Sequence, residues 1–368
     1  MRLFDGWLAF RNRCLTSPVF HEFAQRFPPF RPIVRKRQSE VFDVVAGFVY
    51  SQILQACVEL GVLQLSGLQQ SGMSLEALSN ACDLPPDETR RLADGAVSLR
   101  ILQRSNELYF LGDLGAALSI NTGALAMIKH HSALYQDLGD PVSLLKSGRQ
   151  ETSLSRYWDY ARSLDPTSAK AEDITSYSEL MSASQDDVSK EILASFDFSG
   201  FKTMLDLGGG QGTFARNLLS AYPELDITVF DLPQVVERGR AKLSGESSRI
   251  SFEGGSFFED DLPMGKELVT LVRILHDHDD EPVQNLLNKA FQCLEPGGTL
   301  MIAEPMSTGG HAKRISDAYF NFYLYAMGSG RPRRPKELKN MLNKAGFAYA
   351  ELKSTRFPFT ASIIVAQK

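Results

Sequence analysis

The sequence has few cysteines, and no two of them are closely spaced. Cys14, Cys57, Cys82 and Cys293 are scattered over 368 residues, without the C-x-x-C pairs of a zinc site or the dense pattern of a disulfide framework. Isolated, reduced thiols are typical of intracellular proteins. The sequence also lacks the uninterrupted apolar core and cleavage site of a secretory signal. We therefore expect a cytoplasmic protein without a metal site.

Long hydrophobic runs and an excess of positive charge are also missing. The most apolar stretch, residues 44–58, is interrupted by Ser51, Gln52 and Gln55 and falls short of the about 20 residues of a membrane span, so we expect a buried helix. The net charge of -5 removes the basic field on which nucleic-acid binding usually relies, and we expect no nucleic-acid partner.

The first residues depart from this acidic average. Residues 1–37 carry eight Lys/Arg against Asp5 and Glu22, and aromatic side chains are interleaved among them. This mixture suits peripheral contact with an anionic membrane, an apolar ligand, or packing on a partner subunit. Four prolines break the helical pattern, which favours the partner subunit and leaves membrane contact as the alternative.

Residues 74–111 show the pattern of a winged helix. Ser74 is a predicted cap of a helix that runs through Cys82, Asp87 is the predicted cap of a second helix, and short strands are expected between Ile101 and Phe110. A DNA-reading second helix presents basic and amide side chains, whereas residues 87–94 are charge-balanced. The pattern therefore favours dimerisation, and we expect a homodimer.

From about residue 200 strands and helices alternate, which predicts an α/β domain with a mostly parallel sheet covered on both faces. The expected strands are Thr203–Leu207, Ile227–Phe230, Ile250–Glu253, Leu268–Val272, Thr299–Ala303, Phe347–Leu352 and Ser362–Ala366. In such sheets ligands bind beyond the carboxyl ends of the strands. The predicted organisation is a basic arm (1–40), a winged-helix-like dimerisation domain (41–120), a helical linker with pocket residues (121–195) and a ligand-binding domain (196–368).

A glycine-rich loop follows the first of these strands. Gly208, Gly210 and Gly212 let the backbone approach a ligand closely at a helix N-terminus, and Asp231 ends the next strand, where a carboxylate can accept hydrogen bonds from ribose hydroxyls. A dinucleotide site normally spaces its glycines as G-x-G-x-x-G. Here the spacing is G-x-G-x-G, and Asp206 precedes it, which suits a cationic amino group better than pyrophosphate.

With these motifs, residues 200–368 resemble class I S-adenosylmethionine-dependent O-methyltransferases that carry an N-terminal winged-helix dimerisation domain. The resemblance implies a Rossmann-like fold and S-adenosylmethionine as cofactor. It places Asp206 and the loop 208–212 at the methionine end, and Asp231 at the ribose. Further implied cofactor contacts are Leu232, Ser256, which stands where many relatives have aspartate, Phe257, and Arg273, which replaces a lysine.

The segment 271–281 is similar to the catalytic stretch of that family, and His276 takes the position of its general base. An imidazole suits the role because it accepts a proton near neutral pH. Glu304 matches the acidic residue that orients the histidine. Two departures are His278, where plant members have Trp, and Pro332, where they have a second glutamate.

The sequence His276–Asp280 also reads H-x-H-x-D, the start of a hydrolase metal motif. That motif requires a further histidine, and Glu281 stands in its place.

The acceptor is inferred from aromatic residues and from the N-terminal third. A substrate pocket is predicted from Met181, Asp277, Tyr319, Phe320, Tyr323 and Met327. Residues 7–13, 17–20 and 42–52 resemble bacterial carotenoid O-methyltransferases acting on hydroxyneurosporene and demethylspheroidene, which implies an apolar polyene with a tertiary hydroxyl. Alternatives are a small aromatic hydroxyl or a tetrapyrrole. From other classes, an inactive cofactor-binding regulator and an NAD-dependent oxidoreductase stay open.

Overall fold

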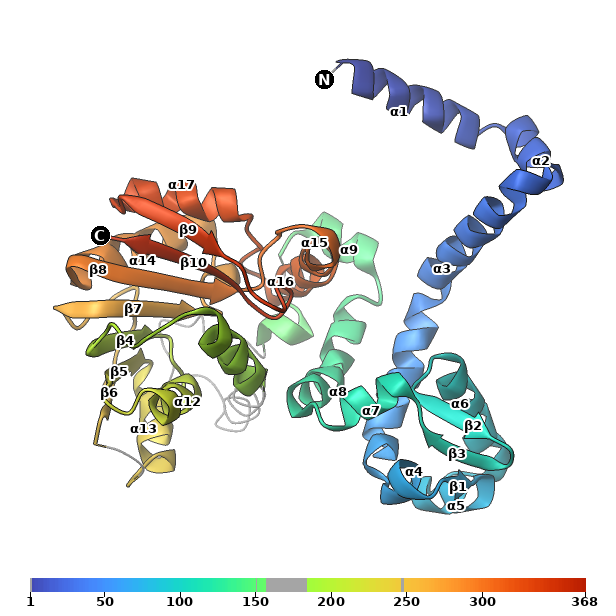
Figure 1. The fold of residues 1–368 in the computed structure, drawn as a ribbon, viewed down its shortest axis with the longest axis horizontal. Coiled ribbons are helices and arrows are strands. Elements are labelled where there is room, and N and C mark those ends of the chain that lie inside the picture. Colours follow the sequence, from blue (N-terminus) through green and yellow to red (C-terminus); the bar gives the residue numbers. More distant parts are fainter. Residues whose placement is uncertain (1, 150, 157–183, 246–247) are drawn as a thin grey trace. The chain divides into compact units, whose positions relative to one another are not determined.

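The computed structural model describes the whole chain except residues 1, 150, 157–183 and 246–247 (Figure 1). The chain divides into two units, Met1–Ile120 and Asn121–Lys368. Each unit has its own secondary structure and is described separately below.

The first unit begins with four helical segments, α1 (Arg2–Leu15), α2 (Pro18–Arg26), the 3₁₀ turn η1 (Pro28–Phe30) and α3 (Arg31–Glu59). The prolines break the helical pattern here as expected, and short helices form between them. Pro18 and Pro28 each occupy the first position of a new helical segment, where the missing N–H costs nothing. Ser17 caps α2 by accepting a hydrogen bond from the N–H of Phe20. The prolines therefore separate helices instead of removing them.

Helix α3 differs from the buried helix expected over residues 44–58. It is 29 residues long, and only Gln55, Cys57 and Val58, near its end, are buried within the chain. Val44 and Phe48 are 84% and 71% exposed. The segment Pro28–Glu59 is long and apolar enough to cross a membrane. The core helix of a soluble protein can meet the same criteria of length and composition. The prediction of a helix is confirmed, whereas its burial within one chain is wrong.

The rest of the first unit has the predicted winged-helix arrangement. It consists of η2 (Val62–Gln64), α4 (Ser66–Gln70), β1 (Met73–Ser74), α5 (Leu75–Cys82), α6 (Pro86–Ser98), β2 (Leu102–Ser105), β3 (Leu108–Leu111) and α7 (Asp113–Ser119). The three strands form an antiparallel sheet in the order β1-β3-β2. Ser74 caps α5 as predicted. Asp87 does not cap α6, because the helix already starts at Pro86 and Asp87 lies in its first turn.

The second unit is a seven-stranded sheet preceded by helices. The helices are α8 (Thr122–Asp137), α9 (Pro141–Ser147) and a helical segment at residues 184–195. The strands are β4 (Thr203–Leu207), β5 (Asp226–Asp231), β6 (Ile250–Gly254), β7 (Lys266–Val272), β8 (Leu294–Glu304), β9 (Tyr349–Lys353) and β10 (Ser362–Gln367). Their order is β6-β5-β4-β7-β8-β10-β9, and β10 alone runs antiparallel to its two neighbours. The predicted α/β fold is confirmed.

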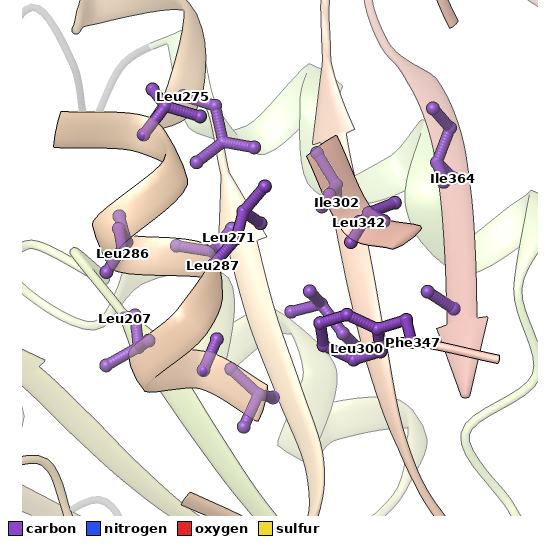
Figure 2. Packing of buried hydrophobic residues seen from close by; sticks show 14 of the residues in the cluster. Leu207, Leu271, Leu275, Leu286, Leu287, Leu300, Ile302, Leu342, Phe347 and Ile364 are labelled. Carbon is purple, nitrogen blue, oxygen red and sulfur yellow. The ribbon is translucent and has the colours of Figure 1, made fainter. Parts of the chain in front are cut away.

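Apolar side chains cover both faces of this sheet, because the strands are central and mostly parallel. One core packs the strands against α14 (Asp280–Cys293) and α17 (Pro335–Ala345), as Figure 2 shows for residues such as Leu271, Leu287 and Leu342. The other core includes α12 (Thr213–Ala221) and the helical segment 184–195. Helix α13 (Pro233–Lys242) lies against β5 and β6.

The order of the strands determines where the loops meet. The chain moves outward from β4 to β6 on one side and from β7 to β8 on the other, so that the sheet has its topological switch point between β4 and β7. All five strands β4 to β8 are parallel, which brings the loops after them to one edge. Ligands of such sheets bind at this point.

Candidate active site

The loop after β4 has the backbone geometry of a ligand cradle. Gly208, Gly210 and Gly212 have φ values of 70°, 60° and 78°, a region that glycine adopts without strain. A Cβ at Gly208 would lie 2.3 Å from the Ile274 side chain, whereas nothing lies within 4 Å of a Cβ at Gly210. The loop is therefore packed at its start and open beside Gly210.

Asp206 lies under this loop and is almost fully buried. Its Oδ1 accepts a hydrogen bond of 2.7 Å from the Thr270 hydroxyl, while its Oδ2 is buried and has no hydrogen-bond partner among the residues that the structure describes. Burial raises the pKa of Asp206 to about 7, against the opposing effect of Thr270. An unpaired buried carboxylate oxygen is costly, and a cationic group beside it would remove that cost.

Asp231 ends β5 and is held by the backbone. Its Oδ2 accepts a hydrogen bond of 2.8 Å from the N–H of Gly210, and its Oδ1 accepts one of 2.7 Å from the N–H of Leu232. Burial raises its pKa, whereas these two backbone hydrogen bonds act in the opposite direction. Each carboxylate oxygen keeps a free lone pair for a hydroxyl donor.

The loop after β6 contains the two residues expected at the adenine. The Ser256 hydroxyl accepts long hydrogen bonds from the N–H groups of Phe258 and Glu259, which leaves its proton free to be donated. The Ser256 N–H donates to Asp260 at 2.8 Å. The Phe257 ring lies 3.5 Å from the place of a Cβ at Gly208, so this loop and the glycine loop are adjacent.

The loop after β7 contains His276, in the turn η4 (Leu275–Asp277), with carboxylates on both sides. Its Nδ1 lies 3.3 Å from Glu304 Oε2, and its backbone N–H donates to the same oxygen at 3.0 Å. Its Nε2 lies 3.1 Å from Asp277 Oδ1. Glu304 is completely buried at the end of β8. The structure thus brings Glu304, from the end of β8, next to His276 and Asp277, from the loop after β7.

These contacts determine the charge of the imidazole. Burial by itself would lower the pKa of His276, but the carboxylates of Asp277 and Glu304 outweigh it and raise the pKa to about 9. At neutral pH His276 is therefore an imidazolium in this arrangement. Its Nε2 becomes a proton acceptor only when the proton shared with Asp277 has left.

The structure also shows the contacts of Arg273 and His278, two further residues singled out in the sequence. Arg273 has φ 60°, and its backbone N–H donates to the carbonyl of Ala303. Its Nη1 donates to the Ser184 hydroxyl at 2.7 Å. Arg273 therefore ties the loop after β7 that contains His276, which we call the catalytic loop, to the helical segment 184–195. His278 packs edge-on against Phe257 and Phe258, with ring centroids 5.8 and 4.9 Å away.

Arg333 contributes to the site and was missed by the sequence analysis. Its side chain is fully buried and donates to the carbonyls of Leu275 and His278 at 2.6 and 2.7 Å, and twice to Asp280 Oδ1. Its own carbonyl accepts a hydrogen bond from the N–H of Ser307, beyond β8. The only signal in the sequence was its position next to Pro332, where a second glutamate was expected.

The neighbours of Arg333 hold the same loop. The N–H of Arg331 donates to the His276 carbonyl, and the Ser329 hydroxyl donates to the Asp277 carbonyl at 2.8 Å. Gly330 lies against the His276 carbonyl: a Cβ added at Gly330 would be 2.1 Å from that oxygen. The φ of Gly330 is 79°. Residues 329–333 therefore fix the backbone of the catalytic loop on one side.

The predicted aromatic pocket residues lie on an irregular helix. Residues Ile315–Phe320 form a π-helical segment, η5, which continues into α16 (Asn321–Met327). Such segments often occur at functional sites. The Phe320 ring lies 6.4 Å from the His276 ring and 5.1 Å from Tyr319. Met327 is buried in a core cluster, and Met181 lies outside the described residues.

Two adjacent histidines of α8, not singled out in the sequence, face these tyrosines. His131 Nε2 lies 2.7 Å from the Tyr319 hydroxyl, and His130 Nε2 lies 3.1 Å from the Tyr323 hydroxyl. Burial, with a smaller effect from His131, lowers the pKa of His130 to about 4, so His130 is neutral. On the side that faces α8, the tyrosines of η5 and α16 are thus paired with uncharged histidines. Within the described residues no cluster of metal-binding side chains occurs.

Comparison with known proteins identifies this arrangement. Residues 135–348 match the O-methyltransferase domain, and residues 42–120 match the O-methyltransferase dimerisation domain. The chain therefore belongs to the S-adenosylmethionine-dependent O-methyltransferase family. Its cofactor is S-adenosylmethionine, which decides against the NAD-dependent oxidoreductase considered above.

Individual relatives support the same assignment. The chain is 38% identical over 364 residues to demethylspheroidene O-methyltransferase of Rhodobacter capsulatus, a match that covers 99% of this chain and 90% of that protein. It is 29% identical to human acetylserotonin O-methyltransferase, with 89% and 96% covered. The crystal structure of human N-acetylserotonin methyltransferase with S-adenosylmethionine superposes with a TM-score of 0.75 at 26% identity, covering 90% of this chain and 97% of that one.

Arg333→Lys should lower the rate of methyl transfer by about ten- to hundredfold, because an ammonium cannot reproduce the forked hydrogen bonds that hold the catalytic loop. Cofactor affinity should change little, since the glycine loop is not touched. Steady-state kinetics and calorimetric titration of the folded variant test this. Arg331→Lys is the control, because the Arg331 side chain is partly exposed and bonds only Asp280 and Glu337. A wild-type kcat for Arg333→Lys would contradict the positioning role.

Proposed function

We propose that this enzyme transfers a methyl group from S-adenosylmethionine to the hydroxyl oxygen of a carotenoid, of the hydroxyneurosporene or demethylspheroidene type. The observation that supports this acceptor is the 38% identity to the R. capsulatus demethylspheroidene enzyme over 99% of the chain. The Tyr319–Phe320 wall next to His276 fits an extended apolar molecule.

The acceptor is tested by incubating the enzyme with S-adenosylmethionine and hydroxylated polyenes, small phenols, N-acetylserotonin and tetrapyrroles. Mass spectrometry detects the gain of one methyl group. We expect turnover with the polyene alcohols and at least about tenfold lower kcat/KM for the others. Preference for a phenol would replace the carotenoid by a small aromatic acceptor. Cofactor binding without turnover on any acceptor would point to an inactive regulator.

The described residues provide a cradle for the cofactor. S-adenosylmethionine, when bound, supplies an electrophilic methyl group on a sulfonium. In our proposal the unpaired Oδ2 of Asp206 receives its ammonium group, and Asp231 accepts from the ribose hydroxyls. Gly208 to Gly212 allow close backbone approach, and Leu232, Ser256 and Phe257 flank the adenosine. Arg273 acts through its bond to Ser184, as a link between segments.

Asp231→Ala should weaken binding of S-adenosylhomocysteine by about ten- to hundredfold, because each charge-assisted hydrogen bond contributes about 1.5–3 kcal/mol. Calorimetric titration measures the affinity. Asp226→Ala, at the opposite and exposed end of the same strand, is the matched control and should bind like the wild type. Unchanged affinity in Asp231→Ala would contradict the role of this carboxylate.

His276 is proposed as the general base. The acceptor hydroxyl would take the place of Asp277 at Nε2 and give its proton to this nitrogen. Bound S-adenosylmethionine would supply the methyl group that the acceptor oxygen gains, and the C–S bond would break to leave S-adenosylhomocysteine. A tertiary alcohol is a weak acid, so the proton leaves late in the reaction. Glu304, at Nδ1, holds the ring in position and stabilises the imidazolium that forms.

The rate of a single turnover should rise as the pH increases from 7 to 9, by up to about tenfold per unit, because the pKa of His276 is raised to about 9 and only the neutral ring accepts a proton. Asp277→Asn removes one of the two carboxylates that raise this pKa, so the rise should move to lower pH. His276→Ala should lower the rate by about 10²- to 10⁴-fold with cofactor affinity intact. If His276→Ala keeps the wild-type rate from pH 6 to 9, the histidine is a bystander.

The match to the dimerisation domain supports a homodimer. We propose that the exposed apolar face of α3, with Val44, Val45 and Phe48, packs on the second subunit, because so apolar a surface is poorly hydrated in a monomer. We also propose that the protein lies in the cytoplasm. Sedimentation of the full-length protein as a monomer at micromolar concentration would contradict the dimer.

A further inference from the structure

The first thirty residues form a surface that the proposed reaction and the dimerisation domain leave unexplained. We call residues 2–30, comprising α1, α2 and η1, the aromatic arm. The dimerisation-domain match starts only at residue 42. The match to the R. capsulatus relative covers 99% of the chain and therefore includes the arm.

One face of α1 is aromatic and lies open to solvent. Trp7 and Phe10 are three positions apart, their ring centroids lie 6.1 Å apart, and they are 55% and 56% exposed. Helical periodicity places Cys14 between Trp7 and Phe10, with Arg11 at one edge of this face and Arg13 at the other. The aromatic face of α1 is thus bordered by positive charges.

A second exposed aromatic group follows at the end of α2. Phe23 stacks on Phe27 at 5.4 Å, and Phe30 meets both rings edge-on. All three rings remain between 36% and 51% exposed although they contact one another. Arg26 precedes Phe27 in the chain and forms an ion pair with Glu22 on the exposed surface. The arm therefore carries a second exposed aromatic group with an arginine next to it in sequence.

The charge of the arm decides between two possible occupants. The arm itself carries a net charge of +2, and Arg31, Arg35, Lys36 and Arg37 directly after it raise the net charge of residues 1–37 to +6, so the rest of the chain carries -11. In a two-fold dimer that pairs residues 1–37 of one subunit with those of the other, two charges of +6 would face each other. An anionic lipid surface instead neutralises the arginines and accepts aromatic rings at headgroup depth.

We propose that the aromatic arm docks the enzyme on an anionic membrane surface. The rings of Trp7, Phe10 and the Phe23–Phe27–Phe30 cluster enter the interfacial region, and Arg11, Arg13 and Arg26 lie among the lipid headgroups. This docking does not depend on the identity of the acceptor, and its test uses no acceptor.

The test is co-sedimentation of the full-length protein with phosphatidylcholine vesicles that contain about 30 mol% phosphatidylglycerol, and with pure phosphatidylcholine vesicles. We expect binding to the anionic vesicles that weakens as salt is raised. Arg11→Glu/Arg13→Glu should weaken it at least about tenfold. Lys336→Glu/Lys344→Glu makes the same change of charge on exposed positions of α17 and should bind like the wild type. Equal loss in both variants, or no binding by the wild type, would overturn the proposal.

Tryptophan fluorescence locates the contact. Vesicles should shift the emission of the wild type to shorter wavelength, and Trp7→Phe should lose this shift. Val44→Ser/Phe48→Ser removes the proposed subunit contact of α3, and the resulting monomer should still bind at saturating vesicle concentration and still show the fluorescence shift. If those α3 changes abolish vesicle binding, α3 and not the arm meets the membrane. If Trp7→Ser/Phe10→Ser converts a dimer to a monomer in sedimentation and leaves vesicle binding unchanged, the arm holds a second copy of the chain. Either result rejects the docking proposal.

Discussion

The contact between His276 and Glu304 is the interaction around which the second unit is organised. A completely buried carboxylate is costly without hydrogen-bond donors, and both the ring and the backbone N–H of His276 supply them to Oε2 of Glu304. The two residues come from the loop after β7 and from the end of β8, and the parallel register that pairs Val272 with Ala303 places them side by side. Any slip of this register would separate the imidazole and the carboxylate.

Residues 329–333 hold the catalytic loop, the loop after β7 that contains His276, in addition to the sheet itself. Its carbonyl groups, which follow the strand without a regular hydrogen-bonded partner, are satisfied by Arg333, Arg331 and Ser329. Its acidic end is also balanced, since Arg149 pairs with Asp279, and both Arg331 and Arg333 pair with Asp280. A carboxylate-rich loop thus keeps one shape through charge-assisted hydrogen bonds to cations on other segments, and of these three cations Arg333 is fully buried.

The two units use their apolar side chains in opposite ways. In the second unit they are enclosed between the sheet and its helices, which produces a rigid platform for the loops. In the first unit many of them lie on the outside of α1, α2 and α3. The buried side chains support the chemistry, and the exposed ones are available for a second subunit and for the lipid surface that we propose.

The sequence by itself determined the features that depend on neighbouring residues. Thr203–Leu207 and its glycine loop were predicted at the right positions, because a short apolar run followed by glycines that adopt positive φ occupies a few consecutive residues. His276 and Glu304 were singled out through the family resemblance; Glu304 ends β8, and His276 lies in the loop after β7.

Only the tertiary structure decided the features that join distant segments. The burial of Arg333 against the carbonyls of Leu275 and His278, and the pairing of His130 and His131 with tyrosines nearly 190 residues away, leave no local pattern. The same reason explains the error on α3: the sequence shows that residues 44–58 are apolar, but burial depends on which surface covers them. An apolar pattern specifies a helix face, and the fold specifies its partner.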